Sequence, residues 1–220
     1  MAITTVVFDV NETLSDLTPM AERFTALGAP AELGPLWFAS TLREGMALAA
    51  GGEMRTFAEL ATATAAGLLA RHGVADPQGG ARHVVQGFLE LPVHPDVHEG
   101  VAALAAAGLR LTTLSNGAAS VAEKLLGDHG LRERFAAVLS VEDAGIWKPA
   151  PASYGYALRT LGVGAGEAVM VAVHPWDLHG AARAGMATAW LDRGGDDWPG
   201  HLTPPTFTVR SLPGLAGLLA

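Results

Sequence analysis

The stretch TTVVFDVNETL, residues 4–14, decides the fold class of this chain. Its first half, residues 4–8, is β-branched or apolar throughout, which is typical of a strand that is covered on both faces. The expected strand ends at Asp9. A carboxylate in that position is poorly solvated, and it costs stability unless a partner compensates its charge. The stretch therefore predicts a central strand with an aspartate at its carboxyl end whose charge is compensated by another group.

The rest of the chain divides into two parts with different patterns. From Asp16 to residue 92, apolar positions recur at steps of three and four residues, which predicts helices and leaves no candidate strand. After residue 92, predicted strands alternate with predicted helices, which implies a parallel sheet with right-handed crossovers. We therefore predict an α/β protein with a doubly wound parallel sheet formed by residues 1–14 and 93–220, and an inserted helical domain at residues 15–92.

The individual elements can be assigned from the same patterns. Strands are predicted at 4–8, 109–114, 138–141, 168–173, 188–191 and 206–209. Helices are predicted from about Leu17 to Leu27, at 36–46, 56–72, 78–91, 97–107 and 118–127, and after Pro151 and Trp176.

Composition excludes several classes of function. The 220 residues contain no cysteine, so a disulfide framework, thiolate metal ligands and a cysteine nucleophile are all excluded. The formal charge of −8 gives no electrostatic footprint for nucleic acid or anionic lipid. The first residues lack a basic leader, and the longest apolar run is too short to span a bilayer. We expect a cytoplasmic protein that acts on a small molecule and contacts neither membrane nor nucleic acid.

Polar residues follow several of the predicted strands at the point where each strand ends. They are Asp9, Ser115 with Asn116, Lys148 in the loop after the third strand, and His174 with Asp177. Ligands of open parallel sheets bind beyond the carboxyl ends of the strands. We therefore expect these groups to meet at one mouth of the sheet.

Asp9 and Lys148 form the sharpest candidate pair. Pro149 favours an extended backbone at Lys148, which aims the long side chain across the loop as a countercharge to Asp9. A paired aspartate can serve as a covalent nucleophile that forms an ester, which water later cleaves. The alternative is that Asp9 only caps a turn or the next helix.

The remaining candidates each have a functional and a structural interpretation. Ser115, Asn116 and Gly117 precede a helix, so the serine either caps that helix or belongs to an anion site. Asp177 either stabilises a helix N-terminus or holds a water molecule. His174 either activates water or packs behind the site near Trp176. The eight histidines show no spacing of metal ligands, and we expect no metal and no other cofactor.

Four motifs together resemble the haloacid dehalogenase superfamily of hydrolases, over nearly the whole chain. They are FDVNETL at 8–14, TLSNG at 113–117, WKPAPASY at 147–154 and VAVHPWDLHGA at 171–181. Within the superfamily they look most like the L-2-haloacid dehalogenases. The resemblance implies a Rossmann-like core, a helical cap and an aspartate nucleophile.

The resemblance also implies roles for individual residues. Asp9 would displace halide from C2 of the substrate, with Thr13 supporting its loop. Ser115 and the backbone of Asn116 would hold the substrate carboxylate, and Lys148 would balance the charge on Asp9. Tyr154 would sit beside that pair, Asp177 would position or activate water, and Trp176 would line the pocket. Dimers are common in the resembling family, so a homodimer is compatible with it.

Four positions depart from the dehalogenase pattern. Asn11 replaces a tyrosine, Phe38 replaces an arginine that follows a Leu-Trp pair, Ala172 replaces a serine, and His174 replaces an asparagine. Asn11 and Phe38 are therefore the candidate substrate-binding residues that differ from those of the dehalogenases.

The phosphatases of the superfamily differ at two of the same places. They carry a second aspartate, which protonates the leaving alkoxide, where this chain has Asn11, and a Mg²⁺-binding acid where it has Val173. Glu12 is a candidate displaced carboxylate at a place where glycine is usual. A halide needs no proton to leave, so the absence of both acids at these positions favours metal-free chemistry at carbon.

The hypothesis is hydrolytic dehalogenation of a small (S)-2-haloacid through an ester at Asp9. The alternatives are a Mg²⁺-dependent phosphatase and a non-catalytic member that binds a small acid.

Overall fold

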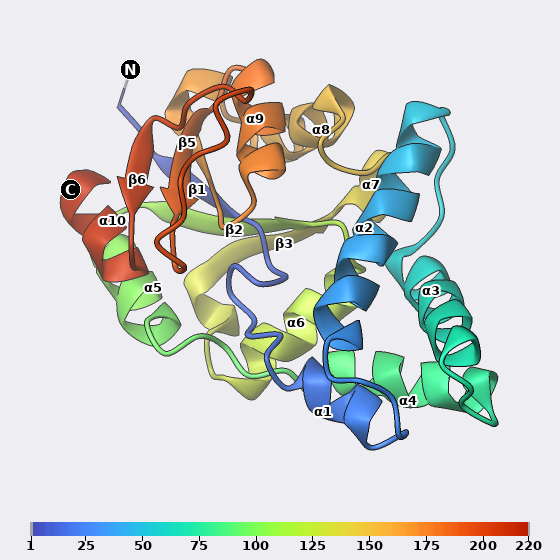
Figure 1. Cartoon of the computed structure of the whole chain (residues 1–220). Coiled ribbons are helices and arrows are strands. Elements are labelled where there is room, and N and C mark those ends of the chain that lie inside the picture. Colours follow the sequence, from blue (N-terminus) through green and yellow to red (C-terminus); the bar gives the residue numbers. More distant parts are fainter. Residues whose placement is uncertain (1, 220) are drawn as a thin grey trace. The chain divides into compact units, whose positions relative to one another are not determined.

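The computed structural model describes residues 2–219, and they fold as two compact units (Figure 1). One unit comprises Met1–Ser15 with Val93–Ala220, and the other comprises Asp16–Pro92. The first unit contains every strand of the sheet, and the second is helical. None of the described helices combines the length and hydrophobicity needed to cross a bilayer.

The first unit is built on a parallel sheet, as the sequence predicts. Within the described residues the strand order is β3-β2-β1-β4-β5-β6, and every pairing is parallel. The strands are β1 (Thr5–Phe8), β2 (Arg110–Ser115), β3 (Phe135–Ser140), β4 (Ala168–Ala172), β5 (Ala187–Leu191) and β6 (Phe207–Val209). Phe8 is in register with Thr113 of β2 and Val171 of β4. Residues just beyond these three strands therefore meet at one edge.

Helices cover both faces of this sheet (Figure 1). One face carries α5 (Val97–Ala106), α6 (Ala119–Asp128) and α10 (Leu212–Leu219), whose apolar residues share one core cluster with Val6 and Phe8. The other face carries α8 (Pro151–Leu161) and α9 (Pro175–Arg183), and α9 packs on β4 and β5. This double cover explains why every residue of β1 is β-branched or aromatic and buried.

The second unit consists of α1 (Met20–Thr25), α2 (Leu33–Ala50), α3 (Phe57–Arg71) and α4 (Pro77–Phe88). Its interior is aromatic, with Trp37 in contact with Phe24 and Phe88. The indole of Trp37 also donates a hydrogen bond to the carbonyl of Ala61, 2.8 Å away. A capping box between Thr56 and Glu59 fixes the start of α3. Trp37 is therefore a core residue of this unit.

Several elements differ from the prediction. Strand β3 begins at Phe135, three residues early, because Ala136 and Ala137 carry no β-branched signal. The single turn α7 (Val141–Ala144) is too short for a periodic pattern; Ser140 caps it and Gly145 ends it at φ 71°. Helix α10 was not predicted, since its sequence LPGLAGLL contains proline and glycine. The first helix starts at Met20, not at Leu17.

Candidate active site

Asp9 lies directly after β1, where the register of the sheet places it beside the end of β4. Its backbone N–H donates to Val171 at 2.9 Å, and the residue is 4% exposed. Three groups contact its carboxylate. The hydroxyl of Thr13 donates to Oδ2 at 2.8 Å, Lys148 Nζ lies 2.9 Å from Oδ1, and His174 Nδ1 lies 3.2 Å from Oδ2. Asp9 is therefore a buried and fully partnered carboxylate, not a helix cap.

Lys148 lies between two aspartates. Its side chain is completely buried, and Nζ contacts both Asp9 and Asp177 Oδ2, the latter at 2.6 Å. The side chain of Asn116 holds the backbone of Lys148, because its Oδ1 accepts from the Lys148 N–H at 2.9 Å and its Nδ2 donates to the carbonyl at 3.5 Å. Asn116 therefore positions the lysine, which the sequence did not indicate.

Asp177 occupies the first turn of α9 and is fully buried. Its Oδ1 accepts from the hydroxyl of Tyr154 at 2.7 Å, while Lys148 contacts its other oxygen. The Tyr154 hydroxyl thus contacts Asp177, which in turn contacts Lys148, and it does not contact Asp9 directly. Gly180 permits this contact, since a Cβ there would lie 2.6 Å from the tyrosine hydroxyl oxygen and 2.8 Å from the Pro149 carbonyl oxygen.

Burial and charge determine the ionisation of this cluster. Burial alone would raise the pKa of Asp9, but the Lys148 ammonium and the His174 hydrogen bond outweigh it and hold that pKa below its usual range. The pKa of Lys148 is raised, because two carboxylates outweigh the burial of its ammonium. Burial raises the pKa of Asp177, and burial beside Asp177 raises that of Tyr154. Asp9 is therefore ionised at neutral pH.

Thr13 connects the loops that follow β1 and β4. Its hydroxyl donates to Asp9 and accepts from the backbone N–H of Val173 at 3.2 Å. Arg193 donates to the backbone carbonyl of Thr13 at 3.1 Å and pairs with Asp96 at 2.7 Å. Thr13 is therefore fixed from several sides, and its hydroxyl holds one oxygen of the Asp9 carboxylate.

His174 bridges Asp9 and Glu12. Its Nε2 lies 2.7 Å from Glu12 Oε2, and its ring stacks on Trp176 with centroids 5.2 Å apart. Burial would lower the pKa of His174, but hydrogen bonds and charges from the two carboxylates raise it to about 9. His174 therefore contacts Asp9 and packs on Trp176, whereas a role in activating water stays a prediction.

Glu12, which the sequence suggested only as a displaced carboxylate for a metal, lies against His174 instead. It has a φ of 63°, in the left-handed region where a side chain is unusual and glycine is favoured. His94 Nε2 lies 2.9 Å from its backbone carbonyl oxygen. The available signal was a glutamate in the loop after the first strand together with a histidine after the fourth.

Ser115 and Asn11 lie near one another beside Gly117. A Cβ on Gly117 would lie 3.4 Å from Ser115 Oγ and 3.9 Å from Asn11 Nδ2. Ser115 ends β2, and its hydroxyl oxygen accepts from the Gly117 N–H at 2.9 Å. The residue before α6 is Ala118, and the described structure shows no side-chain cap there. Ser115 is therefore not the helix cap that one interpretation of the sequence proposed.

Phe38, the other departing residue, belongs to the helical unit. Its ring packs against Phe57 and Phe88, with centroids 6.2 and 6.4 Å away, and the residue is 3% exposed. This is the environment of a packing residue in an aromatic cluster.

The donor set at Asp9 fits Mg²⁺ poorly. Lys148 contacts one carboxylate oxygen, and Thr13 and His174 contact the other. The side chain of Val173 has no oxygen to offer at the position of the expected second acid, and Mg²⁺ requires an octahedral set of oxygens. Among the described residues, no group of three or more acidic, histidine or cysteine side chains is arranged to hold a metal.

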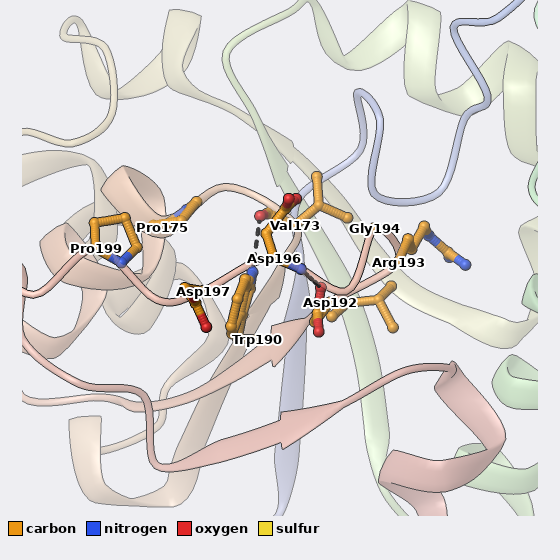
Figure 2. Close-up of a pocket in the computed structure, with 10 residues that line it drawn as sticks. Val173, Pro175, Trp190, Asp192, Arg193, Gly194, Asp196, Asp197 and Pro199 are labelled. Carbon is orange, nitrogen blue, oxygen red and sulfur yellow. Dashed lines mark hydrogen bonds between the residues drawn. The ribbon is translucent and has the colours of Figure 1, made fainter.

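A pocket of about 300 Å³ opens beside the loop that carries His174 (Figure 2). Val173, Pro175 and Trp190 form part of its wall, and the Trp190 indole donates to the Val173 carbonyl at 3.1 Å. Its other lining residues include the carboxylates of Asp192, Asp196 and Asp197. These three carboxylates outnumber the one arginine of the lining, Arg193, so the pocket disfavours an anionic ligand and the groups around Asp9 stay the candidate site.

Comparison with known proteins agrees with this geometry. The sequence model for haloacid dehalogenase-like hydrolases matches residues 3–185. (S)-2-haloacid dehalogenase 4A of Burkholderia cepacia is 30% identical over 216 residues, 97% of this chain and 94% of that protein. Haloacetate dehalogenase H-2 of Moraxella sp. strain B is 29% identical over 143 residues, 65% of this chain and 64% of that protein.

Solved structures share the whole fold. The L-2-haloacid dehalogenase of Xanthobacter autotrophicus, with chloropropionic acid covalently bound, superimposes with a TM-score of 0.90 at 26% identity and covers 99% of this chain and 98% of that one. The predicted fold class is therefore confirmed. With the family model spanning most of its length, the chain belongs to the haloacid dehalogenase-like hydrolases.

Proposed function

We propose that this protein hydrolyses small (S)-2-haloacids through a covalent ester at Asp9, without a metal ion. One observation carries the proposal: Asp9 is an ionised carboxylate paired with a buried ammonium, at a site without the second acid that phosphate chemistry uses. The names of the similar dehalogenases support the substrate class.

In the first step, a carboxylate oxygen of Asp9 attacks C2 of the substrate. The new carbon–oxygen bond forms as the carbon–halogen bond breaks, and the halide leaves with the bonding electrons. Lys148 and Thr13 hold the attacking carboxylate in one orientation, which reduces the entropy lost on reaching the transition state. No proton is required by the leaving group, so Asn11 is compatible with this step.

The substrate carboxylate needs donors near Asp9. The Ser115 hydroxyl and the backbone N–H groups that follow β2 supply them in this proposal, whereas the Asn116 side chain is occupied with Lys148. We assign residues 16–92, the helical unit, as the inserted cap domain of this hydrolase. Water then attacks the ester carbonyl, which releases the hydroxyacid and restores the Asp9 carboxylate.

The test is halide release from L-2-chloropropionate in the presence of a chelator, with the D-enantiomer as a stereochemical control. We expect turnover of the L-acid only, and Asp9→Asn should reduce it by at least about 10³-fold. Absence of halide release across a series of short 2-haloacids would refute the substrate assignment.

The same preparation distinguishes the two alternatives. Hydrolysis of an aryl phosphate that requires added Mg²⁺ and Asp9 would identify a phosphatase. Binding of a 2-haloacid by both the wild type and Asp9→Asn, with no turnover by either, would identify a non-catalytic acid-binding protein.

A further inference from the structure

His174 lies between two carboxylates, one on each ring nitrogen. Nδ1 is 3.2 Å from Asp9 Oδ2, and Nε2 is 2.7 Å from Glu12 Oε2. A ring nitrogen donates to a carboxylate only when it carries a proton, so this arrangement describes an imidazolium in the free enzyme. The ring is also held by its stack on Trp176. Such an imidazolium cannot accept a proton.

Glu12 is aimed at His174 by an unusual backbone. Its φ of 63° is rare for a residue with a side chain, and such conformations persist where surrounding contacts enforce them. Here the imidazole of His94 contacts the Glu12 carbonyl, and the next residue, Thr13, bonds Asp9 and Val173. The loop therefore places a carboxylate at Nε2 of His174, the ring nitrogen that does not contact Asp9.

We propose that Glu12 and His174 together form the base of the second half-reaction, and that ester formation at Asp9 switches this pair on. The proposal rests on the ester proposed above. An esterified Asp9 has no negative charge, so His174 loses one of the two anions that stabilise its proton. It then releases the Nδ1 proton to solvent. The other proton stays on Nε2, where its hydrogen bond to Glu12 holds it. The neutral ring is therefore the tautomer whose Nδ1 lone pair points toward the ester.

Neutral His174 then serves as the proton acceptor in ester hydrolysis. His174 Nδ1 takes a proton from water as the water oxygen bonds to the carbonyl carbon of the Asp9 ester. The tetrahedral intermediate collapses, its bond to the substrate oxygen breaks, and the resulting alkoxide takes the remaining proton from the Asp9 carboxyl group. Asp9 is again a carboxylate, His174 is again an imidazolium, and one proton has passed to solvent in each turnover.

Asp177 is less suited to this role. Both of its carboxylate oxygens are engaged, one by Lys148 and one by Tyr154, and the residue is completely buried. His174 Nδ1 instead lies 3.2 Å from the carboxylate that becomes the ester, so one bound water can reach the carbonyl carbon.

Charged groups from several elements surround His174. Asp9 and Glu12 contact it directly, and Lys148 and Asp177 lie behind Asp9. Two more groups contact the backbone nearby. Arg193 donates to the carbonyl oxygen of Thr13, and His94 contacts the carbonyl oxygen of Glu12. Of these groups, only Asp9 changes charge when the ester forms, so a shift in the titration of His174 reports on that event.

The experiment is a single-turnover reaction with L-2-chloropropionate, followed by rapid quenching, halide assay and intact-protein mass spectrometry. We expect Glu12→Gln to release the first halide normally but to hydrolyse the ester at least about tenfold more slowly, so that the Asp9 adduct accumulates. The matched control is Glu133→Gln, at an exposed glutamate of the same unit, and it should behave as the wild type.

Two further readouts separate a base from a structural role. Loss of the Glu12 carboxylate should move the rising limb of ester hydrolysis to lower pH, whereas a merely structural defect would scale the rate at every pH. Glu12→Gly relieves the left-handed backbone, which offsets part of the loss of the pair with His174, so this variant should still fold cooperatively and accumulate the adduct.

The outcomes are distinguishable. If the wild type neither releases halide nor forms an adduct, the proposed function fails and this inference fails with it. If the wild type turns over and Glu12→Gln hydrolyses its ester at the wild-type rate with the wild-type pH profile, only this inference is overturned.

Discussion

Replacing Lys148 with methionine tests the charge arrangement at the centre of the site. The ammonium is completely buried and contacts Asp9 at 2.9 Å and Asp177 at 2.6 Å, while methionine fills a similar volume without charge. The change leaves two buried carboxylates without their shared cation. Removal of one partner from a buried ion pair costs about 3–5 kcal/mol, because the remaining charge is uncompensated. We expect Lys148→Met to lower the free energy of unfolding by that amount at pH 7.

The pH dependence of this loss gives the more specific check. Without Lys148, burial dominates at Asp177, whose pKa is raised even with the lysine present, and the folded-state pKa of Asp9 should rise although His174 still opposes burial there. Groups of this kind contribute stability below the unfolded pKa and lose it as the pH rises. The difference between variant and wild type should therefore shrink as the pH falls from 7 toward 4.

The assay is urea unfolding at pH 7 and at lower pH. The matched control is Lys124→Met, which removes an exposed pair with Asp128 and should cost less than about 0.5 kcal/mol. If Lys148→Met cost no more than this control, or if its deficit did not change with pH, the electrostatic reasoning about Asp9 would be wrong.

Three further predictions follow from neighbouring contacts. Tyr154→Phe removes the hydroxyl that donates to the Asp177 carboxylate at 2.7 Å, and we expect urea unfolding to show a loss of about 1.5–3 kcal/mol. Gly180→Ala places a methyl group 2.6 Å from the Tyr154 hydroxyl oxygen, so thermal unfolding should show a loss of about 1–3 kcal/mol. His174 has its pKa raised from 6.5 to about 9, so its contribution is fully present below pH 6.5 and is lost as the pH rises through 9. His174→Asn should therefore cost on the order of 3 kcal/mol at pH 6 and much less at pH 10, as measured by urea unfolding.

The sheet was predictable because its signal is local. A β-branched run such as residues 4–8 has few alternatives to a buried strand, and alternation with helices determines the parallel arrangement. The elements that escaped prediction lack such a signal. Strand β3 opens on Phe135–Ala136–Ala137, where pairing with β2, not intrinsic preference, determines the backbone.

The site was predictable only where topology alone brings residues together. Asp9, Ser115 and Asp177 all follow from the rule that parallel strands end at one edge. The contact between Glu12 and His174 depends on a left-handed backbone at Glu12, and the attachment of Asn116 to Lys148 depends on a loop path. Neither conformation has a periodic signature, so the three-dimensional structure was required to reveal them.

The charge balance of the site connects its geometry to the kind of electrophile it can accept. Among the described residues in this cluster, Asp9, Glu12 and Asp177 supply three carboxylates, while Lys148 and His174 supply two cations. The free site therefore carries one excess negative charge, and alkylation of Asp9 removes it. A phosphate ester would bring two further negative charges to the same place, whereas a haloacid brings one and expels another as halide. Because poorly solvated charges interact strongly, this difference favours attack on carbon over attack on phosphorus.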